Sequence, residues 1–472
     1  MSLDTLATNR NPRPSFPMQN DKIVVGLDIG TTKICVLVGR KNEFGKLEIL
    51  GMGKAVSEGV VRGIVSNIDK TVDAIKKAIR LAEEQSGINI GVVNVGIAGQ
   101  HIKSLQHNGS ITRNSAETEI TVDDVNRLTN DMYRLVTPPG SEIIHVMPQD
   151  YKVDYEEGIL DPVGMSGVRL EGNFHIITAQ STAINNINKC VTKAGLEIDN
   201  LILEPLASSM SVLSDEEKEA GVALIDIGGG TTDLAIFKDG IIRHAAVLPF
   251  GGNIVTSDIK QGCLVMQNQA EQLKVKFGKA ISEEASDYEI VSIPGLRDRA
   301  PKEISLKNLA HIIEARMEEI IELVYAEIQR TGHGDKLAAG IVLTGGGSQL
   351  QNLVQLTEYV TGLDTRIGYP NEHLGKSRIE AVKSPMYATT VGLVLAGYRS
   401  IDERTNRPYE EEEAAYRPAP EVRATAAPSM PAAVAAPQPA APKKPSGAGK
   451  FFQDIISRTK GLLIDDFDDK QY

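Results

Sequence analysis

The sequence predicts an α/β protein built from two related halves. The stretches VVGLDIGTTKICVLV (24–38) and LIDIGGGTTDLAIF (224–237) share one layout, in which an apolar strand leads into Asp-Ile-Gly, a Thr-Thr pair and a second apolar strand. Of the 472 residues, 41% are hydrophobic but only 4% are aromatic, which favours the aliphatic core of a parallel sheet covered by helices. We therefore expect more than one domain, with two similar halves facing each other.

Apolar residues at helical spacing mark two helices of these halves. One is expected to start after Asn67, as its N-cap, and to end before Gly87. A longer one is expected to begin near Ser305. The residues that define the two apolar faces are Ile68, Val72, Ile75, Ile79 and Ala82, and Ile313, Met317, Ile320, Val324 and Ile328.

Composition shifts and turn residues divide the chain into predicted segments. In chain order these are a disordered N-terminus (1–21), a first lobe with the first hairpin (22–100), a more polar inserted subdomain (101–174), a connecting helix with the second hairpin (175–252), a largely helical subdomain (253–335), a strand, glycine turn and final apolar helix (336–400), a Pro/Ala-rich linker (401–449) and a tail that regains hydrophobicity (450–472).

Composition also excludes several classes of protein. The formal net charge of -12, from 62 Asp and Glu against 50 Lys and Arg, argues against nonspecific nucleic-acid binding. The three Cys are far apart and fit a reducing compartment, and the eight His show no metal-ligand spacing. We find no signal peptide, no apolar run long enough to span a membrane and no Walker-type phosphate loop.

The glycine turns have two explanations. A tight hairpin alone would contain Gly, Asp and Thr, which are ordinary turn residues. The repetition favours a phosphate site, because backbone N–H groups of a glycine turn approach anions closely and Thr hydroxyls add donors. Asp28 and Asp226 would then face Mg²⁺, and Lys33 could approach a phosphate. Compared letter by letter, the second copy has two extra glycines, Gly229 and Gly230, before its threonines.

A third glycine turn, TGGGSQ from Thr344, follows a strand but carries no Asp. It suits an uncharged ligand part such as a nucleoside. In AEQLKVKFG, Glu271 and Lys274 lie on adjacent turns of a helix face, where they could hydrogen-bond ribose and base. The three turns in this order predict nucleotide binding.

These residues resemble the actin-like ATPase superfamily. DIGTTK matches its first phosphate loop, DIGGGTTD its second and GIVLTGGGSQL its adenosine loop. Within the superfamily the chain resembles the FtsA family of bacterial cell-division proteins, over about residues 22–400 and in the kind of tail. HVMPQDYKVDYEEGILDPVGMSGVRL is similar to that family's own inserted subdomain, and LPFGGNIVTSDI and LASSMSVL are similar to further segments of it.

The resemblance implies an actin-like two-lobed fold with ATP and Mg²⁺ in the cleft. Helices near 181–195 and 384–397 would form the hinge, and ATP turnover would be slow at most, with Asp226 and Gln180 as catalytic candidates. The predicted nucleotide-binding residues are Asp28, Gly30, Thr31, Thr32, Lys33, Asp226, Gly228, Gly229, Gly230, Thr231, Thr232, Asp233, Gly251, Gly252, Asn253, Glu271, Lys274, Gly345, Gly346, Gly347 and Ser348.

The resemblance also implies partners. It predicts an adaptor that self-assembles, tethers filaments of the tubulin-like protein FtsZ to the cytoplasmic face of the inner membrane at the division site, and helps to recruit later division proteins. The FtsZ tail would dock on the helical subdomain, where Arg316, with Arg297 and Arg299 nearby, matches a basic surface. Solvation of exposed Arg side chains is the alternative.

The tail KFFQDIISRTKGLLI forms an amphipathic helix when it is placed on a helical wheel. An apolar ridge with basic flanks suits the lipid interface, and docking into a protein groove is the alternative. The acidic end DDFDD departs from the usual basic tails of the family. The predicted membrane-binding residues are Phe451, Phe452, Ile455, Ile456, Arg458, Lys460, Leu462 and Leu463.

Two other functions are compatible with the same fold. A sugar or acetate kinase would need a catalytic base and a polar substrate pocket, which the sequence does not mark, and it has no use for a lipid-seeking tail. A pilus-assembly adaptor would share the inserted subdomain. The insert, the tail and the sequence around Arg316 favour the cell-division adaptor.

Overall fold

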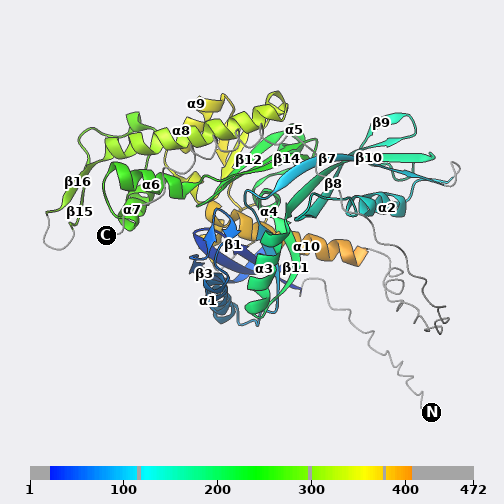
Figure 1. Cartoon of the computed structure of the whole chain (residues 1–472), viewed down its shortest axis with the longest axis horizontal. Coiled ribbons are helices and arrows are strands. Elements are labelled where there is room, and N and C mark those ends of the chain that lie inside the picture. Colours follow the sequence, from blue (N-terminus) through cyan, green and yellow to red (C-terminus); the bar gives the residue numbers. More distant parts are fainter. Residues whose placement is uncertain (1–21, 114–117, 296–299, 376–378, 407–472) are drawn as a thin grey trace, which may run out of the picture. The chain divides into compact units, whose positions relative to one another are not determined.

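The computed structural model of the chain describes residues 22–113, 118–295, 300–375 and 379–406 (Figure 1). All of these belong to one compact unit. The predicted N-terminal segment, most of the linker, the amphipathic tail, Arg297 and Arg299 lie outside the described residues.

Each half of the unit contains a five-stranded sheet, and the two sheets have the same topology. The first has the order β11-β6-β1-β2-β3 and the second the order β14-β13-β12-β17-β18. In both, a three-stranded antiparallel meander is extended by two parallel strands. The strands are β1 Ile23–Ile29, β2 Lys33–Lys41, β3 Leu47–Val56, β6 Val92–Ile97, β11 Glu197–Leu203, β12 Val222–Ile227, β13 Thr232–Lys238, β14 Ile241–Leu248, β17 Ile341–Thr344 and β18 Thr365–Ile367.

The first lobe is covered by α1 (Ile68–Ser86) and α3 (Ser181–Lys193), and a small hairpin of β4 (Val60–Val61) and β5 (Ile64–Val65) precedes α1. The predicted ends of α1 are confirmed. The Asn67 side chain accepts a hydrogen bond from the Lys70 amide, and Gly87 closes the helix in a left-handed conformation.

The helical subdomain of the second lobe follows β14. The start of α8 at Ser305 is confirmed, because the Ser305 side chain caps the helix. In Figure 1 this subdomain and the β7–β10 sheet lie at opposite ends of the unit. Its elements, with the neighbouring helices of the lobe, are α5 Asp215–Ala220, α6 Gly252–Gly262, α7 Gln267–Phe277, β15 Ile290–Ile293, β16 Lys302–Ser305, α8 Leu306–Arg330 and α9 Leu353–Thr361.

The inserted subdomain forms a separate antiparallel sheet of order β7-β10-β8-β9, with one helix against it. Its own core contains the fully buried Leu128, Leu170 and Phe174. The elements are β7 Lys103–Thr112, α2 Val122–Met132, β8 Ser141–Val153, β9 Glu156–Ile159 and β10 Arg169–Gln180.

The two lobes meet where α4 (Glu204–Val212) crosses α10 (Ala388–Asn406). A Cβ atom at Gly392 of α10 would lie 1.8 Å from the Ala207 carbonyl oxygen, so the backbones of the two helices touch. Of the two predicted hinge helices, the one near 181–195 is therefore wrong. The segment 181–195 forms α3 and packs on α1, whereas α4 makes the crossing.

Candidate nucleotide site

The two Asp-Ile-Gly hairpins have the same length. Asp28 pairs in register with Cys35, and Asp226 pairs in register with Asp233. The expectation of two extra glycines in the second copy is therefore wrong. The Thr-Thr pairs do not correspond, because the second turn has glycines where the first has threonines.

The side chains of the first turn fill the space left by the glycines of the second. A Cβ atom at Gly229 would lie 2.2 Å from the Thr32 side chain, and one at Gly230 would lie 2.6 Å from the Thr31 hydroxyl. Neither glycine has a positive φ. Close approach of the two turns requires glycine here, which argues against a hairpin that serves only as a turn.

A partly buried cation neutralises Asp28. The Lys33 Nζ atom lies 3.0 Å from Asp28 Oδ2, and the Thr390 hydroxyl of α10 donates to the same oxygen at 3.3 Å. Burial lowers the pKa of Lys33, but the charges of Asp28, Cys35 and Asp226 and the hydrogen bond to Asp28 together outweigh that effect and hold this pKa above its ordinary value. The ammonium group therefore stays charged inside the cleft.

Hydroxyl groups, rather than a cation, hold Asp226. Ser208 of α4 donates to Asp226 Oδ2 at 2.7 Å, and Thr389 of α10 donates at 3.1 Å. Gly345, with φ +84°, lies so close that a Cβ atom would be 2.3 Å from Asp226 Oδ1. Burial raises the pKa of Asp226, and these hydrogen bonds only partly oppose the rise.

Two further carboxyl groups share this buried space. Burial, together with the charges of Asp226 and Asp28, raises the pKa of Asp233, and its Oδ1 atom is buried without a hydrogen-bond partner. Burial and the neighbouring acidic side chains raise the pKa of Glu204 well above its ordinary value. Glu204 is not among the site residues that the sequence predicts. The small-residue run LASSMSVL just after it, typical of a close helix crossing, is the signal that could have found it.

The turns 28–33 and 226–231, which we call the phosphate turns after their predicted ligand, surround a small cavity of about 60 Å³, the phosphate cavity. A larger cavity of about 480 Å³ shares part of this lining. Glu271 and Lys274 line the larger cavity. Lys274 Nζ lies 2.8 Å from Glu271 Oε2 and donates to the Gly252 carbonyl oxygen at 2.9 Å. The volume of the larger cavity is in the range of ordinary ligand sites, roughly 300–1,000 Å³. Lining residues that the sequence did not predict include Gly63, Lys54, Met317, Gln349, Leu350, Met386 and Thr389.

Most of the predicted nucleotide-binding and catalytic residues line one or both cavities. Four do not. The Thr232 hydroxyl donates to the Phe250 carbonyl oxygen, and the Ser348 hydroxyl donates to the Gly345 carbonyl oxygen. Both hydroxyls therefore bond the backbone and do not face the cavities. Gly251 packs against the backbone of the second turn. Gln180 is exposed at the start of α3, outside the lining of both cavities.

The residues present fit Mg²⁺ bound together with phosphate. Within the part of the chain that the structure describes, no three His, Cys, Asp or Glu side chains converge to hold a metal by themselves. Mg²⁺ usually keeps several waters and takes one or two carboxylates beside phosphate oxygens. Asp28, Asp226 and the unpartnered Asp233 oxygen offer that donor set.

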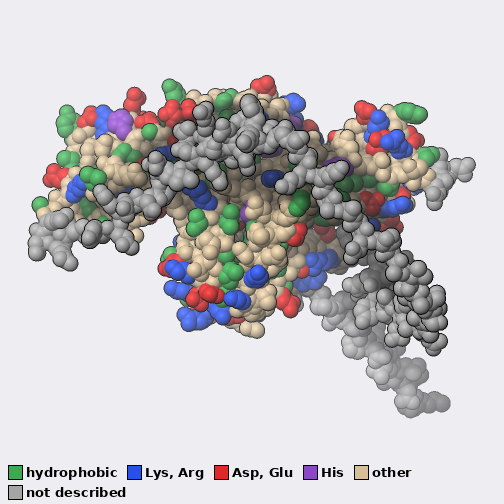
Figure 2. Space-filling model, in the orientation of Figure 1, with side chains coloured by type: hydrophobic (Ala, Val, Ile, Leu, Met, Phe, Trp, Pro, Cys, Tyr) green, Lys and Arg blue, Asp and Glu red, His purple; other side chains and the backbone are tan. Residues whose placement is uncertain are grey.

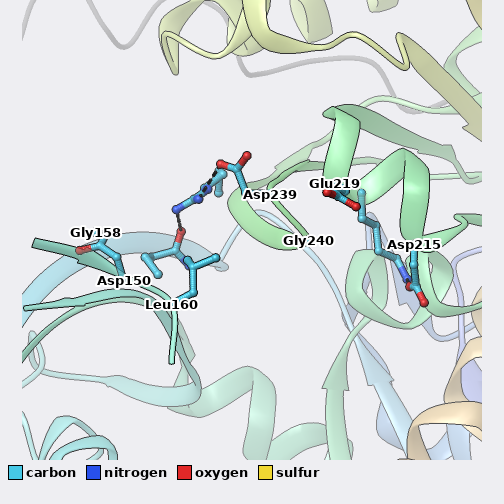
Figure 3. A pocket seen from close by; sticks show the side chains of 10 residues that line it. Asp150, Gly158, Leu160, Asp215, Glu219, Asp239 and Gly240 are labelled. Atoms are coloured by element: carbon cyan, nitrogen blue, oxygen red, sulfur yellow. Dashed lines mark hydrogen bonds and ion pairs between the residues drawn. The ribbon is translucent and has the colours of Figure 1, made fainter. Parts of the chain in front are cut away.

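A larger hollow of about 780 Å³ lies between the inserted subdomain and the second lobe (Figure 3). None of the predicted nucleotide residues lines it. Its two cationic side chains are engaged, since Arg243 bonds Asp239 at 3.1 Å and Gln149 at 3.4 Å, and Lys218 bonds Asp215 at 3.2 Å. The hollow therefore lies apart from the candidate nucleotide site.

Arg316 lies on α8 and is tied to its neighbours. It bonds Asp258 of α6 at 2.5 Å and also pairs with Glu319. The side chain is a quarter exposed, so it is neither free in solvent nor fully buried. A partner carboxylate at this position would share Arg316 with these two acids.

The surface in Figure 2 mixes acidic and basic side chains. Among the helices in the described ranges, none combines the length and hydropathy needed to cross a bilayer.

Comparison with known proteins follows the same division of the chain. Residues 223–392 match the family model "Cell division protein FtsA", and residues 99–178 match the model "SHS2 domain inserted in FTSA". The chain is 42% identical to the cell division protein FtsA of Pseudomonas aeruginosa, over 80% of this chain and 90% of that protein. It is 37% identical to that of Escherichia coli (strain K12), over 80% and 91%.

A solved structure shares the fold at low sequence identity. The PilM-PilN type IV pilus biogenesis complex matches with a TM-score of 0.57 and 15% identity, over 79% of this chain and 98% of that one. The likeness shows the fold alone. The family matches decide for the division alternative over the pilus alternative. The predicted actin-like two-lobed fold with its inserted subdomain is confirmed, and the chain belongs to the FtsA family of cell division proteins.

Proposed function

We propose that this division protein binds ATP and Mg²⁺ in the cleft and works as a self-assembling adaptor. The observation that carries the proposal is the pair of equal hairpins whose turns interlock around buried carboxyl groups and Lys33. Buried acids with raised pKa values, gathered beside glycine turns, are typical of a site that is completed by a ligand.

Each group has a role in this proposal. The turn amides and the Thr31 and Thr32 hydroxyls would bind phosphate oxygens, and Lys33 would move from Asp28 toward a phosphate. Asp28 and Asp226 would hold Mg²⁺, which supplies positive charge between phosphate and carboxylates. Glu271 and Lys274 would contact the nucleoside in the larger cavity. The small cavity holds only a few water-sized groups, so the turns must part slightly to admit the phosphates.

Turnover in such a site would be slow at most. Glu204 lines the phosphate cavity and carries a carboxyl group that can exchange a proton, and burial raises its pKa above the ordinary value, whereas Gln180 lies outside the cavity. We therefore place the water-activating role at Glu204 in preference to Gln180, with Asp226 as the second candidate catalytic group.

Titration with fluorescent ATP, with and without Mg²⁺, tests the nucleotide proposal. We expect Mg²⁺-dependent binding by the wild type and its loss in Asp226→Ala. Asp73→Ala, on the exposed face of α1, is the control and should bind normally. Equal affinity of Asp226→Ala and wild type would refute the metal role.

The tail and the membrane form the second part of the proposal. Membership of the FtsA family and the amphipathic pattern of 450–464 support tethering of FtsZ filaments to the cytoplasmic face of the inner membrane at the division site. Assembly would help through multivalency, because one such helix binds lipid weakly. Recruitment of later division proteins would follow from that location.

Co-sedimentation with anionic vesicles tests the tether. The full chain should pellet, more strongly with ATP and Mg²⁺, and a chain that stops before Lys450 should stay in the supernatant. If both remain in the supernatant, the tail docks on protein instead.

A peptide of the FtsZ C-terminus tests the docking surface. Arg316→Glu should weaken binding to the protein, and Arg330→Glu, near the end of the same helix, is the control. Unchanged binding by Arg316→Glu would leave Arg316 as a purely structural residue, bonded to Asp258 and Glu319.

A further inference from the structure

One hydrogen bond joins the inserted subdomain to the phosphate cavity. The Leu203 amide, at the end of β11, donates to His145 Nε2 of β8 at 3.0 Å. Leu203 is also the N-cap residue of α4, and its own side chain gives that helix no cap. The inserted subdomain therefore supplies the acceptor at the point where β11 turns into α4.

The next residue along the chain is Glu204, the first of α4, whose side chain enters the phosphate cavity. The path of this side chain is narrow. A Cβ atom at Gly96 of β6 would lie 3.0 Å from Glu204 Cγ and 3.2 Å from Oε1. Gly96 holds one side of Glu204, and the Leu203–His145 bond holds the backbone from which it starts.

We propose that His145 is a positioning residue that sets Glu204 in the phosphate cavity and so couples the inserted subdomain to the state of that cavity. The proposal rests on nucleotide binding in the cleft. When phosphate and Mg²⁺ shift Glu204, the turn into α4 shifts with it, and the hydrogen bond carries the change to β8.

The protonation state of His145 suits this role. Because the Leu203 amide donates to Nε2, the ring carries its proton on Nδ1. Burial lowers the pKa of His145 to about 4, so the ring is neutral at physiological pH and Nε2 remains an acceptor. The link is therefore constant in the cell and does not act as a pH switch.

Hydrogen exchange on the full chain, with and without ATP and Mg²⁺, tests the coupling. We compare wild type with His145→Leu, which removes the acceptor, and with His145→Gln, whose Oε1 lies near the place of Nε2. His107→Leu, on exposed β7 of the same subdomain, is the matched control. ATP affinity is measured for every variant by the fluorescence titration.

In the wild type and in His107→Leu, we expect ATP and Mg²⁺ to slow exchange in both α4 and β8. In His145→Leu the effect on α4 should remain, the effect on β8 should disappear, and phosphate release should fall by about tenfold because Glu204 is misplaced. His145→Gln should restore both. Affinity for ATP should stay within about threefold throughout, as a positioning role predicts.

The outcomes separate the two proposals. If the wild type fails to bind ATP, nucleotide binding and this inference fall together. If it binds ATP but β8 does not respond, or if β8 responds equally in His145→Leu, the inference alone is wrong. Equal defects in His145→Gln and His145→Leu would show that His145 contributes packing only. If His145→Leu does not fold, the inference is still tested by the response of β8 to ATP in the wild type and by hydrogen exchange and phosphate release in His145→Gln.

Discussion

The two phosphate turns have the same backbone and opposite chemistry. In the first turn, Lys33 pairs with Asp28. In the second turn, Thr231 takes the position of Lys33, because the Gly228 amide donates to the Thr231 carbonyl oxygen as the Gly30 amide donates to that of Lys33. Asp226 is left with hydroxyl partners and faces Asp233 across its strand pair. The first turn is electrically balanced, whereas the second holds acids that repel each other.

This difference indicates where a ligand is needed. Burial of several acidic side chains in one space lowers the stability of the fold, unless a bound cation offsets their charge. Under the proposed function, the first turn would supply its own cation beside phosphate, whereas the second would depend on a cation that arrives with the nucleotide. The second turn would then carry the larger share of metal binding.

Exchanging the chemistry of the turns should have the largest effect. Thr231→Lys places an ammonium group beside Asp226, as Lys33 lies beside Asp28. Because that charge replaces the cation, the factor by which Mg²⁺ strengthens ATP binding should fall by about 100-fold. Fluorescent ATP titrations across Mg²⁺ concentrations measure this factor.

Thr231→Met, which has a similar length but no charge, is the control for Thr231→Lys and should keep most of the Mg²⁺ dependence. An unaltered Mg²⁺ dependence in Thr231→Lys would show that Asp226 does not meet the metal, and the division of labour between the turns would be wrong.

Breaking the steric fit of the turns should have a smaller effect. Gly230→Ala adds a Cβ atom 2.6 Å from the Thr31 hydroxyl, so the turns must separate. We expect ATP affinity to fall by about tenfold, or about 1.4 kcal/mol. Adding Thr31→Gly should recover part of the loss, although Thr31→Gly alone also loses a phosphate donor.

Gly91→Ala serves as the control for this pair, because a Cβ atom at Gly91 meets nothing within 4 Å. Strict additivity of Gly230→Ala and Thr31→Gly would mean that the two residues do not share the contact that the structure places between them.

The sequence predicted those parts of the fold that local patterns determine. Asn67, Gly87 and Ser305 end or start helices as expected, because capping depends on neighbours within one turn. The duplicated hairpins predicted the duplicated sheets. The pairing of the two turns was mistaken, because matching letters aligned Thr-Thr with Thr-Thr, whereas backbone hydrogen bonds fix the true register.

The missing part of the site comes from contacts between distant segments. Ser208, Thr389 and Thr390 reach the two aspartates only because α4 crosses α10. The small-residue run LASSMSVL is typical of a close helix crossing, but it does not specify which helix is the partner. Glu204 enters the cavity for the same reason, while Gln180 follows a strand that ends outside it. Long-range packing decided which acid faces the phosphate turns.

The pH dependence of stability should give the smallest effect. Because the pKa of Asp233 is raised by burial and by Asp226 and Asp28, the ligand-free fold carries a penalty. The penalty is full above the folded-state pKa and is relieved as the pH falls through it toward the unfolded value near 3.9. Asp233→Asn should therefore be more stable than wild type at pH 7, by on the order of 1 kcal/mol.

Urea unfolding at several pH values, without nucleotide, measures this difference. The advantage of Asp233→Asn should shrink from pH 7 to pH 4, because wild-type Asp233 becomes protonated in the fold. Cys35→Ser, at the corresponding position of the first turn, is the control. Burial raises the pKa of the Cys35 thiol to about 11, so the thiol stays protonated in this range and its difference should be constant. A pH-independent advantage of Asp233→Asn would mean that packing, and not charge, distinguishes the second turn from the first.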